Sequence, residues 1–393
     1  MKKTFLTLFI LFLLPFIAGA DTSKIFMFSP PSAPNIKWEI GTSVTNIGLS
    51  NSLMPANNYF GKKIVFDFDE LNDDFNFNLG GFSRPLYFRC YTNKKAGIFD
   101  WRGFGVGASA EAFGYAHITE TLISLGRAVN DVSGLGAAVF LGMDAPFYFH
   151  YKKFNVTIQP SIFFPFFYID PGMSYVNYTN NNKLGINYAF RVYSIGSMDD
   201  GKKMTAIPGM DLKLSAEYPL LEVLDLGLDI ISIPIIPAVM KDYMGLSGSF
   251  KIDEYNSEDP GSFIKVGMND IEYGTGRLMV FRPFQMLFWA NWRRPIFNFP
   301  LFFIPVLGFS VNPIYVQRVS LEAGLTANYD LKELFIFSLG FSYTDRCWNN
   351  SLGIVFMLKY FQLDLGLDLR AKNYAQSWQG YGHGCRLGFK VRW

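Results

Sequence analysis

The sequence has few of the residues from which disulfide-bonded and metal-binding proteins are built. Among its 393 residues are three cysteines, Cys90, Cys347 and Cys385, and three histidines. An odd and low cysteine count excludes a scaffold that depends on disulfides, and no C-x-x-C pair is present to hold zinc. We therefore expect no metal site and no cofactor.

Charge is also scarce. Charged residues make up 17% of the chain, against roughly 25% in an average soluble domain. The 35 Lys and Arg residues nearly balance the 33 Asp and Glu residues, so no strongly basic surface is expected and nucleic acid is not an expected partner. Hydrophobic residues reach 50% and aromatic residues 18%, which makes the chain unusually apolar.

Long apolar runs are missing once the first twenty residues are set aside. Those residues hold two lysines, an apolar run over 5–17 and small residues over 18–20. This is the pattern of a secretory signal peptide, so residues 1–20 are predicted to be removed and residues 21–393 to work outside the cytoplasm. The longest later run, 228–240, is interrupted by Asp229, Pro234 and Pro237. Transmembrane helices are therefore not predicted.

Alternation of apolar with polar or small residues is abundant instead. It is clear in "FNVTIQPSIFF" (154–164), "VSLEAGLTANY" (319–329) and "FQLDLGLDLR" (361–370). Each pattern predicts a strand with one apolar face. Because only helices and closed barrels can span a bilayer, an apolar exported chain without helical spans predicts a transmembrane antiparallel β-barrel in the bacterial outer membrane, surrounded by outer-membrane lipid. The alternative is a secreted β-sandwich or propeller, which would normally carry more charge.

Fourteen strands can be placed along the chain, with twelve or sixteen as alternatives. They lie near 36–49, 75–91, 99–116, 134–151, 154–168, 208–218, 224–235, 275–292, 300–312, 318–330, 334–345, 351–359, 361–371 and 381–393. Short links alternate with long polar ones, as in bacterial barrels. The long links are 50–74, 117–133, 169–207 and 236–274. Residues 50–74 are a possible lumen or rim insertion, and short helices are predicted over 117–129 and around 53–60.

The last predicted strand, "GCRLGFKVRW", alternates from Cys385 to Trp393. It is expected to close the barrel by pairing with the first strand, because an unpaired apolar strand would promote aggregation. It also resembles the terminal signal of outer-membrane proteins, which implies that the barrel assembly machinery binds the strand that ends at Trp393. The residues between its apolar positions are charged or small. Together with the preceding strand they predict an ion-paired inner wall, in which Asp364, Asp368 and Arg370 face Arg386, Lys390 and Arg392.

Three segments are apolar on both faces: "SIFFPFFYID", "MVFRPFQMLFWANW" and "PLFFIPVLGF". A water-filled pore does not need them, so an apolar binding site on the inner wall is predicted. The residues predicted to contact a ligand are Phe163, Phe167, Phe284, Phe288 and Phe303. An internal plug packed against this wall and an incorrect assignment of the inward face are the alternatives. Prolines 165, 283 and 305 within these segments predict bulges or kinks, because proline lacks the N–H that a strand ladder requires.

The segments "GTSVTNIGLSNSLMPANNYFGKKIVFDFDEL" and "FGVGASAEAFGYAHI" resemble spirochaete outer-membrane barrels distantly related to the long-chain fatty-acid transporter family. The resemblance is strongest over residues 36–130. It implies a fourteen-stranded barrel with an N-terminal plug and a hydrophobic ligand path. Where the family's plug has Asn-Pro-Ala, this chain has Met54-Pro55-Ala56.

These observations predict passive transport of small hydrophobic molecules, with long-chain fatty acids as the expected cargo. A general aqueous porin and a surface adhesin or structural barrel without transport are the alternatives. Catalysis would require a histidine close to a serine or a carboxylate. Only His117, His150 and His383 are available, and an enzyme is not expected.

Overall fold

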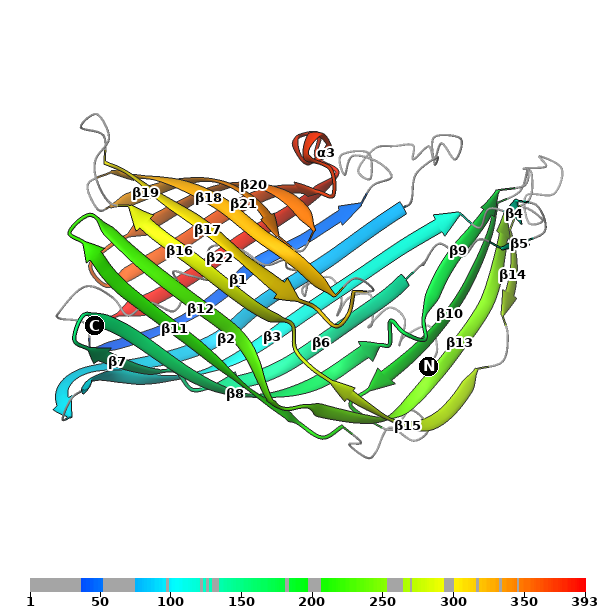
Figure 1. Ribbon diagram of the computed structural model, residues 1–393, viewed down its shortest axis with the longest axis horizontal. Helices are drawn as coiled ribbons and strands as arrows, with labels where there is room; N and C mark the ends of the chain where they lie inside the picture. The colour runs from blue at the N-terminus through cyan, green and yellow to red at the C-terminus, as the bar shows by residue number, and fades with distance from the viewer. Residues whose placement is uncertain are drawn as a thin grey trace.

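The computed structural model describes residues 37–51, 75–96, 99–120, 123–124, 127–128, 134–180, 184–196, 206–252, 264–268, 271–292, 300–315, 318–331, 334–344 and 346–393. Neighbouring staves pair antiparallel around a closed barrel of fourteen staves (Figure 1), where a stave is one wall position made of one strand or of several strands in line. The predicted fold class and strand number are therefore confirmed.

Most staves are single strands: β1 (Trp38–Asn51), β2 (Phe75–Ala96), β3 (Phe99–Glu120), β8 (Phe154–Ile169), β17 (Leu301–Val311), β18 (Val319–Leu331), β19 (Phe335–Thr344), β20 (Cys347–Met357), β21 (Phe361–Ala371) and β22 (Gly382–Arg392). The others are β6 (Gly134–Asp144) with β7 (Phe147–Tyr151), β10 (Leu184–Ser194) with β11 (Gly209–Leu221), β12 (Leu224–Ile236) with β13 (Ala238–Ile252), and β15 (Glu272–Val280) with β16 (Phe284–Trp292).

The barrel closes between β1 and β22, as the sequence predicted. Val44 lies opposite Leu387 and Gly48 opposite Gly384 in an antiparallel ladder. Beyond the last paired residues, the N–H of Trp38 donates to the carbonyl of Trp393 at 2.9 Å, and the N–H of Trp393 donates back to Trp38 at 3.1 Å. Both edges of the sheet are thereby satisfied.

The two faces of the wall have opposite character. On β18, Leu321 is 72% exposed whereas the neighbouring Glu322 is 1% exposed. On β22, Leu387 and Phe389 are exposed while Gly384 and Gly388 are buried. Apolar side chains thus cover the outside and polar side chains the inside, which is stable where hydrocarbon surrounds the barrel. The protein is a barrel of the bacterial outer membrane. Among the described residues no helix is long and apolar enough to cross a membrane.

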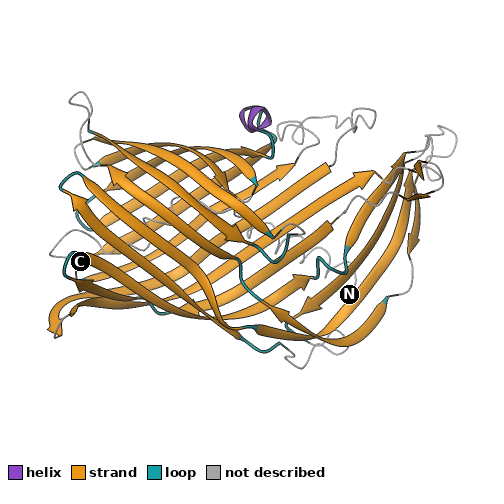
Figure 2. Ribbon diagram, in the orientation of Figure 1, coloured by secondary structure: helices purple, strands orange, loops and turns teal. Residues whose placement is uncertain are grey.

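Two predicted loops, 169–207 and 236–274, are wrong over much of their length. They contain β9 (Tyr175–Asn180), β10, β13 and β14 (Ile264–Met268). β10 pairs with β13 from Leu184 to Tyr193, for example Phe190 with Leu246. The polar composition of these regions, rich in glycine, asparagine and aspartate, predicts loops. The ladder satisfies their backbone groups all the same, and the wall extends at one end (Figure 2).

The helix predicted over 117–129 is also wrong at the described positions. β3 continues to Glu120, and β4 (Ile123–Ser124) pairs with β5 (Arg127–Ala128). Thr119 pairs with Asn177 of β9, so the ladder takes the backbone bonds that a helix would use. The one described helix, α3 (Tyr374–Trp378), was not predicted. Its N-cap is Asn373, whose side-chain oxygen accepts the N–H of Ala375 at 2.9 Å.

Several predictions lie outside the described residues. These are the signal peptide at 1–20, the helix around 53–60, and the insertion at 50–74 apart from the end of β1.

Candidate functional site

Neighbouring staves of the wall are interrupted at one level. In β8 the register against β6 shifts at Pro165, since Val139 pairs with Phe167 and Phe140 with Pro165. The next stave is divided between β10, which ends at Ser194, and β11, which begins at Gly209, and the following one is interrupted at Pro237. Pro283 lies in the break between β15 and β16. The irregularities predicted at Pro165 and Pro283 are confirmed. Pro305 lies in regular register opposite Leu325 of β18, whereas the pairing with β16 omits it between Trp289–Val306 and Trp292–Phe303.

An apolar cluster lies inside the barrel at this level. Its residues come from β6, β8, β10, β13, β15, the link between β10 and β11 and the link between β17 and β18. They are Ala138, Phe140, Phe163, Tyr168, Tyr193, Ala206, Ala238, Met240, Val280 and Ile314. Phe140 and Phe163 pack edge to face at 5.8 Å between ring centroids. Phe163 belongs to the same inward row of β8 as Gln159 and Ser161. We call this set the inner apolar cluster.

The structure brings one of the five predicted ligand residues into this cluster. Phe163 is 2% exposed and lies within it. Phe167 is half-buried beside the Pro165 bulge. Phe288 is 49% exposed between the buried residues Leu287 and Trp289, so its ring lies on the outer face.

Phe284 and Phe303 are half-buried and share the outward alternation, because their neighbours Gln285 and Ile304 are buried. The patch predicted from Phe284, Phe288 and Phe303 is therefore not on the inner wall. The buried residues of these strands form a separate cluster of Leu287, Trp289, Ile304 and Val306. The sequence contained one signal for this facing: Gln285 and Asn291, which are polar, have the same alternation as Leu287 and Trp289.

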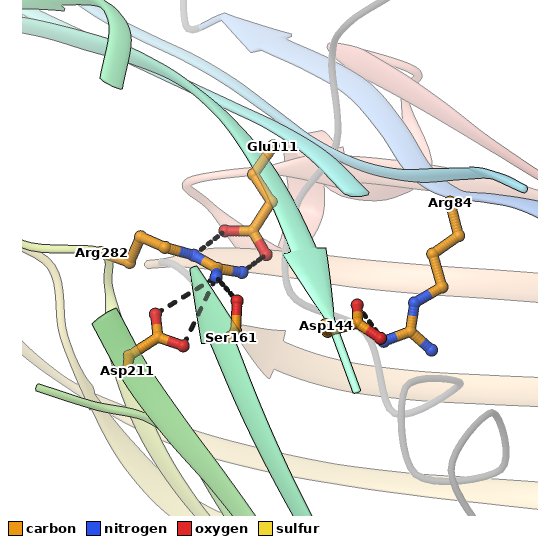
Figure 3. A network of polar contacts seen from close by, with 6 residues as sticks. All are labelled: Arg84, Glu111, Asp144, Ser161, Asp211 and Arg282. Carbon is orange, nitrogen blue, oxygen red and sulfur yellow. Dashed lines mark hydrogen bonds and ion pairs between the residues drawn. The ribbon is translucent and has the colours of Figure 1, made fainter. Parts of the chain in front are cut away.

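Beside the inner apolar cluster a buried arginine joins strands from several parts of the wall (Figure 3). Arg282 lies in the break between β15 and β16. Its guanidinium donates to Ser161 Oγ at 2.9 Å, pairs with Asp211 Oδ2 at 3.1 Å and forms a two-pronged ion pair with Glu111. It lies 5.6 Å from the ring centroid of Phe163. One cation thus holds two buried carboxylates at the edge of the apolar cluster.

The contact between Arg282 and Glu111 crosses the interior. Along the wall, the staves that contain β6, β8, β11 and β12 lie between β3, which carries Glu111, and the break that carries Arg282. Side chains can meet across so many staves only through the lumen, because adjacent strands are about 4.8 Å apart. A second pair, Arg84 with Asp144 at 2.8 Å, lies nearby (Figure 3). Charged side chains therefore lie in the lumen at this level.

Other ion pairs follow the wall. Arg386 donates to Asp364 at 3.0 Å between β22 and β21, which confirms that part of the predicted ion-paired wall. Arg392 pairs across the closing seam with Glu39 of β1 at 2.8 Å, and Glu39 also accepts from Arg89 at 3.1 Å. These contacts join neighbouring strands.

The histidines take part in ordinary packing contacts. The ring of His117 stacks on Tyr115 at 6.4 Å between centroids, and His150 Nδ1 lies 2.9 Å from Asn155 Oδ1. His383 is exposed on the outward row of β22. No cluster of metal-ligating side chains occurs in the described part of the chain.

Taken together, the fold and this interior define an outer-membrane β-barrel with a packed lumen. No protein-family model matches the chain, and a search of curated proteins finds no match. Among solved structures it is similar to the Pseudomonas putida toluene transporter TodX, with 10% identity over 92% of this chain and 90% of that one and a TM-score of 0.44.

Two further solved structures are similar to this chain, with comparable sequence identity and TM-scores. The Ralstonia pickettii toluene transporter TbuX has 10% identity over 91% and 89% of the two chains, with a TM-score of 0.43. A Pseudomonas aeruginosa FadL homologue has 12% identity over 91% and 90%, with a TM-score of 0.40. The likeness is one of fold, and these organisms give no support to a spirochaete origin.

Proposed function

We propose that this barrel transports small hydrophobic molecules across the outer membrane by passive diffusion, and that long-chain fatty acids are its cargo. The observation that supports this most directly is the inner apolar cluster. Burial of aromatic and aliphatic side chains inside a barrel whose inner wall also carries many polar side chains provides an environment that a hydrophobic solute prefers to water.

The position of the cluster supports the same proposal. It lies where neighbouring staves are interrupted, so side-chain packing replaces part of the regular ladder there. Side chains can change rotamer on a much shorter timescale than a strand can be displaced. A hydrophobic solute can therefore occupy this region without breaking a continuous row of backbone hydrogen bonds. Phe163 is the residue we propose as its first contact.

The two alternatives fit the interior less well. A general aqueous porin needs a continuous hydrated path, whereas the pair between Arg282 and Glu111 crosses the lumen. A surface adhesin or structural barrel has no use for an apolar cluster inside its wall. TodX and TbuX are described as toluene transporters, which is compatible with a hydrophobic cargo of another size. We also propose that the barrel assembly machinery binds the strand that ends at Trp393.

Uptake of labelled oleate by cells that lack their own fatty-acid transporter tests the proposal. Cells that make the wild-type barrel should accumulate oleate faster than cells with an empty vector. Phe163→Ser, which places a hydroxyl in the inner apolar cluster, should slow uptake. Phe288→Ser is the matched control, because it removes the same ring from the outer face. Uptake of toluene without uptake of oleate would show that the cargo is a smaller hydrocarbon and not a long-chain fatty acid. Ion conductance of porin size without uptake of either would favour an aqueous porin, and neither signal would favour an adhesin.

A further inference from the structure

Charged residues line the pocket beside the inner apolar cluster in balanced numbers. Its cations are Arg84, Lys213 and Arg282, and its carboxylates are Glu111, Asp144 and Asp211. Gln159, Ser161 and Ser232 complete the polar lining. These side chains would support a file of water and ions if the pocket were continuous along the barrel. Within this lining, Arg282 reaches across the lumen to Glu111, and Arg84 pairs with Asp144.

We propose that Arg282 is a specificity-determining residue that closes the barrel to hydrated ions. Its guanidinium joins Glu111 on β3, Ser161 on β8 and Asp211 on β11, and so bridges separate parts of the wall with one side chain. The guanidinium therefore has four side-chain contacts, since the ring of Phe163 also lies against it. We call these contacts of Arg282 the tie. The tie excludes hydrated ions, while the inner apolar cluster beside it remains available to hydrophobic solutes.

The charged residues around the contact between Arg282 and Glu111 predict which ions would pass if that contact were broken. With Arg282 in place, the pocket has three cations and three carboxylates. Replacing Arg282 with methionine leaves two cations against three carboxylates, which favours cations. Replacing Glu111 and Asp211 with their amides leaves three cations against one carboxylate, which favours anions. Both changes open the tie, and they predict selectivities of opposite sign.

Single-channel recording in planar lipid bilayers tests this inference. The wild-type barrel should show little conductance in potassium chloride. Arg282→Met should increase the conductance several-fold, with a reversal potential in a salt gradient that shows preference for potassium. The double variant Glu111→Gln with Asp211→Asn should increase it comparably with preference for chloride. Arg386→Met is the matched control, because it removes a partly buried ion pair between the adjacent strands β21 and β22 and should leave the conductance low.

A shift of apparent mass between unheated and boiled samples on a denaturing gel establishes which variants are folded. Should one opening variant fail to fold, the other carries the test, because they remove opposite partners of the same contact. Porin-sized conductance in the wild type would overturn the inference, and so would folded opening variants that conduct no better than Arg386→Met. Increased conductance of equal selectivity in both variants would also overturn it. Oleate uptake is measured separately. If oleate is not transported, the conductance of the variants still tests the role of Arg282 independently.

Discussion

Trp289 Nε1–H donates a hydrogen bond of 2.8 Å to Asp229 Oδ2 on the neighbouring stave, and both side chains are buried inside the barrel. The indole belongs to the separate buried cluster of Leu287, Trp289, Ile304 and Val306. The carboxylate of Asp229 accepts the hydrogen bond from the one polar atom of the indole. The pair shows how this barrel buries aromatic surface next to charge.

Removal of the acceptor in that pair should destabilise the barrel. Asp229→Ala leaves the Trp289 N–H buried without this partner, which costs about 1–3 kcal/mol. Asp229→Asn keeps an acceptor oxygen at the same position and should lose less. The free energy of unfolding in urea, followed by tryptophan fluorescence in detergent micelles, measures both. Equal stability of the two variants would show that the hydrogen bond contributes nothing.

Gly227 should not tolerate a side chain. The indole of Trp289 occupies the space that a Cβ on Gly227 would need, since a Cβ at residue 227 would lie 2.6 Å from the indole Cδ2 and closer still to other ring atoms. Gly227→Ala should force the indole out of place and cost about 1–3 kcal/mol. Gly245→Ala is the control, because its nearest neighbour would be at 3.4 Å, an ordinary contact. The difference between their midpoints of thermal unfolding tests the close approach, which is refuted if the two variants melt alike.

The closing seam should depend on Glu39. This carboxylate is 1% exposed and pairs with both Arg89 and Arg392. Glu39→Ala leaves two cations without their carboxylate, and loss of one partner from a buried ion pair costs about 3–5 kcal/mol. Asp100→Ala, which breaks a half-exposed pair with Arg102 at 3.8 Å, should cost less than about 1 kcal/mol. Stability toward urea distinguishes them, and a larger loss for Asp100→Ala would contradict the ranking.

Charge on the outer face should be tolerated only near the membrane surface. Leu321, in the outward row of β18, is covered by lipid, so Leu321→Arg should destabilise the barrel by about 2–4 kcal/mol if it lies near the midplane. Leu331→Arg, at the end of the same strand, should cost about 1 kcal/mol or less. Reversible unfolding from phospholipid vesicles measures both. Equal costs would show that the outer face is not graded by depth.

The last two strands could be predicted residue by residue because charge and apolarity alternate strictly in them. Arg386 and Asp364 were placed facing each other from that pattern alone, and they pair at 3.0 Å. The strand from Phe284 to Trp292 could not be predicted in the same way. Its residues are apolar on both faces, so nothing in most of the segment distinguishes inside from outside, and Phe288 was assigned to the wrong face.

The tie between Arg282 and Glu111 was not predictable from sequence. The two residues are 171 positions apart; Glu111 lies on β3, and Arg282 lies between β15 and β16, neither of which pairs with β3. Their contact depends on closure of the whole barrel and on a break in the wall that carries Arg282 inward. Local alternation describes which face a side chain takes, whereas a contact across the lumen depends on the position of many strands at once.

The interruptions at Pro165, Pro237 and Pro283 make the wall mechanically uneven. A regular ladder resists stretching because every step would break backbone hydrogen bonds, while at this level part of that resistance is replaced by dispersion forces between rings and methyl groups. Strain applied to the barrel by lateral pressure in the bilayer should therefore concentrate along this band. The irregularity that shapes the interior should thus make the barrel wall easier to deform at this level than elsewhere.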